Sequence, residues 1–99
     1  MSRSKLDYLI LDAIADDVES VPDIRGKVQE SESIVEFDLI PSLRRLTRDR
    51  LIEACVLNGT ELEGAGEGVW PPGGVEDFWF RITARGRMVH GNRADEGAV

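Results

Sequence analysis

The sequence of 99 residues contains one cysteine, Cys55, and one histidine, His90. A single cysteine excludes an intrachain disulfide and a metal site built from cysteine pairs. A single histidine argues against a transition-metal site, and no third group is evident that could orient it toward Cys55 as a catalytic pair. Cys55 lies in a stretch with strand periodicity, so we expect a small buried residue and not a nucleophile. We therefore expect no enzymatic activity and no cofactor.

Long apolar runs are also missing. No run approaches the roughly 18 residues of a membrane span, and the first residues lead into an amphipathic stretch with Asp7 and Asp12, unlike a signal peptide. The hydrophobic content of 41% is typical of a globular chain. We predict a cytoplasmic protein with one domain over residues 1–90 and a disordered tail over 91–99.

Basic residues are outnumbered, and the net charge is −7. This balance opposes nucleic-acid binding, because phosphate neutralisation supplies most non-specific affinity. The charges are nevertheless segregated. Residues 44–50 hold four arginines against one acid, residues 78–93 hold four arginines and no acid, and residues 53–77 hold six acids and no base. Eight of the twelve basic residues thus fall on two segments, and nearly all of the acids lie elsewhere.

The stretch 38–52 organises the chain. Leu39, Leu43 and Leu46 recur at spacings of four and three, which predicts a helix over 39–49 with one apolar face. Asp38 can cap this helix, and Pro41 is tolerated because it lies in the first turn. The apolar period then shortens, which predicts a strand over 53–57. A helix with outward arginines that leads into a strand is typical of a winged helix-turn-helix.

The other segments complete this architecture, an α+β fold that is mainly α. We expect a first helix over 5–16 capped by Ser4, with Tyr8 and Leu11 toward its flank, where either more core or a partner could cover them. The remaining expected elements are a brief strand within 18–21, a helix over 23–30, a packed linker over 31–37, a strand over 78–82 and a short helix over 84–90 capped by Thr83. Glycine and proline over 58–77 predict a long loop without regular structure at the tip of a two-stranded wing.

Two motifs resemble PadR-type transcriptional regulators. The run 39–46, followed by Asp49, Leu51 and Ile52, is similar to the family's recognition-helix pattern Leu-Tyr-Pro-Ala-Leu-Arg-Arg-Leu and Asp-Gly-Leu-Ile. The run 79–83, with Gly86 and Arg87, is similar to its Tyr-Tyr-Arg-Leu-Thr-x-x-Gly-Arg. The resemblance spans roughly residues 5–90 and implies a winged helix that binds DNA, with the recognition helix over 39–49 in the major groove and the wing over 53–82 on the backbone.

The sequence departs from the PadR pattern at two points. Arg50 stands where the pattern has glycine. We also expect the chain to lack the long C-terminal helices through which PadR proteins dimerise.

Helical geometry assigns roles to the arginines. An advance of about 100° per residue places Arg44, Arg45 and Arg48 opposite the leucine face. The N-terminal half of a recognition helix usually meets base edges, so Ser42 and Arg45 are candidates for base contact. Arg44 and Arg48, with Arg81 on the wing, are candidates for phosphate contact. Two acids near the helix entry, Glu36 and Asp38, oppose this assignment.

The predicted partners are double-stranded DNA and a second copy of the chain. Because operators usually match a protein two-fold axis, we expect a homodimer. Candidate contacts for a partner subunit or another protein are Tyr8, Leu11, Trp70 and Trp79.

A second hypothesis is an acidic winged-helix module that contacts a protein through the loop 58–77 and does not bind DNA. The segment Trp70-Pro71-Pro72 within this loop could dock on a partner. It could also fold back over the wing, against Phe78 and Trp79. The placement of the arginines favours the DNA-binding regulator over this module.

Overall fold

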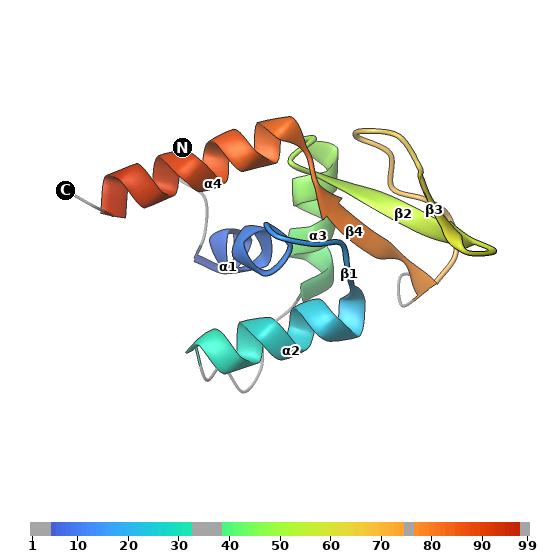
Figure 1. Cartoon of the computed structure of the whole chain (residues 1–99), viewed down its shortest axis with the longest axis horizontal. Coiled ribbons are helices and arrows are strands. Elements are labelled where there is room, and N and C mark those ends of the chain that lie inside the picture. Colours follow the sequence, from blue (N-terminus) through green and yellow to red (C-terminus); the bar gives the residue numbers. More distant parts are fainter. Residues whose placement is uncertain (1–4, 33–38, 75–76, 98–99) are drawn as a thin grey trace.

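The computed structural model describes residues 5–32, 39–74 and 77–97 (Figure 1). These residues form four helices and one four-stranded antiparallel sheet, which confirms the predicted α+β class. The elements in chain order are α1 (Lys5–Ala13), β1 (Glu19–Ser20), α2 (Val21–Glu32), α3 (Leu39–Arg48), β2 (Ile52–Asn58), β3 (Glu61–Gly64), β4 (Trp79–Ile82) and α4 (Ala84–Gly97). The expected caps Ser4 and Asp38, the acid Glu36 and most of the linker lie outside the described residues. None of the described helices has the length and apolarity that crossing a membrane requires.

The sheet has the strand order β1-β4-β2-β3. Strand β4 pairs on one side with β2, where Ala54 faces Phe80, and on the other with β1, where Glu19 faces Phe80. The pairing of β2 with β4 and the brief strand within 18–21 were both predicted and are confirmed. Phe80 is fully buried because it lies on the inner strand that joins the two halves of the sheet.

The prediction that residues 58–77 contain no regular structure is wrong. Residues 61–64 form β3, which pairs with β2 so that Asn58 lies opposite Glu61. The connecting residues are Gly59 and Thr60, and Gly59 has φ 66°. A positive φ at the first central residue is what a type II′ hairpin turn requires, and glycine adopts it without a steric penalty. The hairpin points away from the helices (Figure 1), and residues 65–74 that follow it contain no helix or strand.

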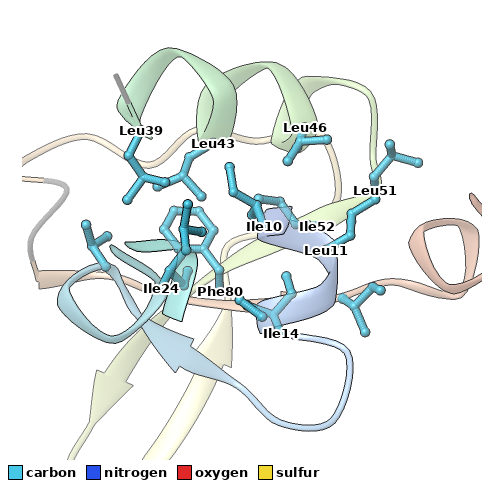
Figure 2. Packing of buried hydrophobic residues seen from close by; sticks show 14 of the residues in the cluster. Ile10, Leu11, Ile14, Ile24, Leu39, Leu43, Leu46, Leu51, Ile52 and Phe80 are labelled. Carbon is cyan, nitrogen blue, oxygen red and sulfur yellow. The ribbon is translucent and has the colours of Figure 1, made fainter. Parts of the chain in front are cut away.

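The core lies between the helices and the sheet. In Figure 2, Leu39, Leu43 and Leu46 of α3 point toward Ile10 of α1 and the ring of Phe80. The leucine spacing therefore predicted the buried face of α3 correctly.

Leu11 was expected on the flank of α1, but it is 0% exposed. The reason is α4, which packs against a further side of α1. Arg87 Nη1 donates to the carbonyl of Ala15 at 3.0 Å, and His90 Nε2 lies 3.2 Å from Asp12 Oδ1. Helix α4 thus covers a side of α1 that either more core or a partner could have covered.

Helix α4 is longer than predicted. The expected end at His90 is wrong, because the helix continues to Gly97 and so includes residues 91–97 of the expected tail. Gly91 lies inside the helix, where one glycine costs only about 1 kcal/mol relative to alanine. The predicted domain boundary at residue 90 therefore falls within a helix.

The junction between α3 and β2 is closed by main-chain hydrogen bonds. Arg50 N–H donates to Thr47 O and Leu51 N–H donates to Leu46 O, both at 3.0 Å. These two bonds are the Schellman pattern that ends many helices, with the left-handed position occupied by Arg50 at φ 65°. Glycine adopts a positive φ without a steric penalty, so this position favours glycine although arginine occupies it.

The start of α4 is fixed to the same junction. Thr83 caps the helix as predicted, because its Oγ1 accepts the N–H of Gly86 at 3.0 Å. Thr83 N–H also donates to the carbonyl of Leu51 at 3.1 Å. Gly86 lies directly against that carbonyl, and a Cβ at this position would be 2.1 Å from the Leu51 oxygen.

Candidate nucleic-acid interface

The outer face of α3 carries exposed arginines. Arg44 and Arg48 are four residues apart, so they lie one above the other on the side opposite the leucines. Arg44 is exposed, and the side chain of Arg48 is 74% exposed. Their outward position agrees with the prediction from helical geometry.

A groove of about 450 Å³ runs along this face. One wall comes from α3 and the other from the segment 65–74, which returns from the β2–β3 hairpin toward the helix. The lining residues are Pro41, Arg44, Arg45, Arg48, Gly68 and Trp70. Three of the five residues predicted to contact DNA therefore share one groove.

Arg45 lines this groove but its guanidinium is held by α1. Arg45 Nη2 bonds to Asp7 Oδ1, Arg45 Nε donates to Asp7 Oδ2 at 3.3 Å, and Nη2 lies 3.2 Å from Ser42 Oγ. Asp7 is only 1% exposed. The hydrogen bond to Asp7 raises the pKa of Arg45 against the opposing effect of burial. The predicted role of Arg45 in base contact is not supported, because its charge is paired with a buried carboxylate.

Ser42 is not presented for base contact either. It is 5% exposed and its hydroxyl faces Arg45. The physical reason is its place in the sequence, three residues after Leu39 and four before Leu46, which puts it on the buried side of α3. The spacing contained this information, but the prediction gave more weight to the position of Ser42 near the helix start.

Arg81 lies outside the groove. It is opposite Glu53 in the pairing of β4 with β2, and its Nε donates to Glu53 Oε1 at 2.7 Å. This hydrogen bond raises the pKa of Arg81. Glu53 is 8% exposed and also accepts the N–H of Gly66 at 3.0 Å. The carboxylate of Glu53 thus neutralises the arginine that was predicted to hold a phosphate from the wing.

Trp70 folds back onto the sheet and α3. Its ring centroid lies 6.0 Å from that of Phe80, with 30° between the planes. The Arg44 guanidinium carbon lies over the Trp70 ring at 5.5 Å from the centroid. Folding back was one of two alternatives from the sequence, and the structure has it, with Phe80 as the aromatic contact instead of Phe78 or Trp79. The contact with Arg44 was not predicted, because no local signal connects residues 44 and 70.

The predicted partner contacts differ in exposure. Leu11 is buried in the core and is withdrawn as a surface contact. Tyr8 and Trp70 are half-buried against the core, and Trp79 is half-buried on β4. Three of the four side chains thus keep some exposed surface.

Cys55 and His90 lie on different elements, β2 and α4. Cys55 is fully buried, and this burial raises the pKa of its thiol. His90 on α4 lies near Asp12 of α1. Among the described residues, no group of three or more His, Cys, Asp or Glu could hold a metal ion.

Comparisons with protein-family models, with curated proteins and with solved structures found no match to this chain. Any functional conclusion therefore rests on its own residues and their geometry.

Proposed function

We propose that this chain is a DNA-binding transcriptional regulator of the winged-helix class, similar to PadR proteins. The observation that carries the proposal is the pair Arg44 and Arg48, exposed on α3 and lining one groove. The element order supports it. In this proposal α3 corresponds to the recognition helix of a winged helix, and β2, β3 and β4 correspond to its wing.

The two exposed arginines are proposed to hold phosphates. A guanidinium matches phosphate oxygens with two parallel hydrogen bonds. Arg48 lies 3.6 Å from Asp49, but an ion pair between exposed side chains contributes only about 0–1 kcal/mol, so a phosphate can replace it. Arg45, held by Asp7, keeps α3 in position. Because Ser42 is buried and Arg45 is paired, we propose that α3 mainly contacts the backbone of the nucleic acid.

The acidic hairpin limits how DNA can approach. Glu61 and Glu63 on β3 are exposed, and they would repel a backbone that lay along the hairpin. We therefore place the nucleic acid over Arg44 and Arg48, with the hairpin tip directed away from it.

A homodimer is part of the proposal. Met88 on α4 is 69% exposed, so this helix presents a large apolar side chain that a second copy of the chain could cover. We propose that α4 contributes to the dimer contact. Sedimentation equilibrium of the wild type and of Met88→Glu tests it: a dimer that the substitution dissociates is expected, and a wild-type monomer at high micromolar concentration contradicts it.

The proposed function is tested by fluorescence anisotropy with non-specific duplex DNA over a salt series. We expect affinity to fall steeply with salt. The double substitution Arg44→Ala with Arg48→Ala is expected to reduce the slope of log K against log salt by about 1.8, from about 0.9 per phosphate contact. Arg85→Ala, an exposed arginine of α4 outside the groove, serves as the control. If the wild type fails to bind at low salt, the proposal is wrong.

A second candidate is a protein-interaction module, favoured by the β2–β3 hairpin. Val56 and Leu57 are 42% and 52% exposed, next to the exposed acids Glu61 and Glu63. Val56 lies opposite Glu63 on one face of the hairpin, and Leu57, the next residue, lies opposite Leu62 on the other face. An exposed apolar side chain beside exposed acids fits a basic, partly apolar partner. This candidate becomes the better one if the folded protein does not bind DNA at low salt.

A further inference from the structure

We infer that the groove between α3 and Trp70 binds a nucleotide of an unpaired strand, with its phosphate on Arg44 and Arg48 and its base stacked on the planar pair of Arg44 and Trp70. This inference rests on the proposed function, because it assigns phosphates to the same two arginines. It adds the preference for a single strand and a role for Trp70.

The size of the groove argues for one strand. A volume of about 450 Å³ is in the range of sites that enclose a small ligand. An α-helix with its side chains is about 10–12 Å across, and the major groove of B-DNA is about 12 Å wide. A single helix therefore fills the major groove. Here Gly68 and Trp70 lie beside the arginine face of α3, so helix and segment together are too wide to enter it.

The second argument is the planar surface beside the charges. Unpaired bases stack on aromatic rings and on arginine planes, and this stacking does not depend on the base. Trp70 is held in place by Phe80, and Arg44 lies over its ring. The stacking surface is thus already formed in the structure, so a bound base would not have to order it. Bases inside a duplex are stacked on each other and cannot use such a surface.

The third argument is the charge that remains available. Arg45 and Arg81 are paired with Asp7 and Glu53. Among the described residues, Arg44 instead faces a ring, and Arg48 has only its weak contact with the neighbouring Asp49. The positive charge on α3 that no buried carboxylate holds therefore lies in this groove and extends over one helical turn, from Arg44 to Arg48. Successive nucleotides of one strand can contact these two arginines.

The substitution Arg44→Lys separates stacking from charge, because lysine keeps the positive charge but has no planar group. The experiment measures binding of a 12-nucleotide oligothymidine and of a 12-base-pair duplex by anisotropy, at equal salt. Emission of Trp70 is followed in a Trp79→Phe background, where Trp70 is the remaining tryptophan. Arg85→Lys is the matched control, and far-ultraviolet circular dichroism verifies that each variant is folded.

The expected result has three parts. The single strand binds more tightly than the duplex and quenches Trp70. Arg44→Lys weakens single-strand binding by about five-fold or more, since stacking contributes about 1–3 kcal/mol per base, and changes duplex binding by less than about two-fold. Trp70→Phe, which keeps a ring, retains more single-strand affinity than Trp70→Leu.

Other results distinguish the two proposals. If the duplex binds at least as tightly as the single strand, or if single-strand binding leaves Trp70 emission and the Arg44→Lys affinity unchanged, the inference is overturned while the proposed function stands. If the folded wild type binds neither nucleic acid at low salt, both are overturned.

Discussion

The guanidinium of Arg45 on α3 is hydrogen-bonded to the carboxylate of Asp7, a side chain of α1 that is almost completely buried. This contact joins two helices across the core and decides what Arg45 can do. The buried carboxylate of Asp7 needs a charged partner, and Arg45 supplies it. The main role of Arg45 is therefore to stabilise the fold, and only the exposed part of its side chain can contact a ligand.

Loss of Arg45 is therefore expected to destabilise the protein. Arg45→Ala leaves the buried carboxylate of Asp7 without its arginine, and we expect the free energy of unfolding to fall by about 2–4 kcal/mol. Urea denaturation followed by circular dichroism measures this change. Arg48→Ala on the same helix is the control and is expected to change stability by less than about 0.5 kcal/mol, as for most exposed positions. Equal effects of the two substitutions would show that the ion pair contributes little.

Arg50→Gly is expected to stabilise the protein. Arg50 has φ 65°, and a left-handed backbone costs a residue with a Cβ roughly 1–2 kcal/mol. Glycine removes this cost but loses more conformational entropy on folding, so we expect a net gain of about 1 kcal/mol, seen as a higher Tm. Arg48→Gly, in the last turn of α3, should have the opposite sign. A lower Tm for Arg50→Gly would mean that the arginine side chain makes a stronger contact than the structure indicates.

Two glycines of α4 are expected to respond oppositely to alanine. At Gly86 a Cβ would lie 2.1 Å from the carbonyl oxygen of Leu51, a main-chain atom that cannot move independently. We expect Gly86→Ala to cost about 3 kcal/mol or more, because helix and strand must separate. At Gly91 a Cβ meets nothing within 4 Å, so Gly91→Ala should stabilise the helix by about 0.5–1 kcal/mol. Thermal unfolding of both variants measures the difference, and a neutral Gly86→Ala would contradict the close packing.

Stability is expected to decrease at alkaline pH through Cys55. Burial raises the pKa of this thiol in the folded state. Once the pH exceeds the unfolded value of about 8.5, the unfolded chain loses the proton first, and the folded state is destabilised until its own pKa is reached. Urea unfolding between pH 7 and 10 should show this decrease, and the decrease should be smaller in Cys55→Ala. A parallel pH dependence of the two proteins would assign it to other groups.

The sequence predicted those parts of the fold that depend on local periodicity. The spacing of Leu39, Leu43 and Leu46 gave α3 within a residue of its end, and the alternation over 78–82 gave β4. The hairpin of β2 and β3 was missed because the many glycines after residue 58 were interpreted together as loop, although Asn58-Gly59 is itself a hairpin signal. The local signal for the turn is present in the sequence, but the glycines and prolines that follow it are equally typical of a loop.

The candidate site depended on contacts between distant residues, and these were not predictable from spacing. Arg45 meets Asp7 across 38 positions of sequence, and Arg44 meets Trp70 from another element. Helical geometry placed the arginines on the outer face, but it could not show which charges the rest of the chain would neutralise. Packing of α4 likewise buried Leu11, because that helix comes from the far end of the described chain.

The pairing of β1 with β4 has a consequence for synthesis of the chain. Glu19 lies opposite Phe80, so the strand that completes the sheet is made long after the strand it joins. When α1, α2 and α3 have been synthesised, the ring of Phe80 that fills their common core has not yet been added. Until Phe80 is added, the apolar faces of these helices remain exposed. We therefore expect folding to be completed late and in one cooperative step.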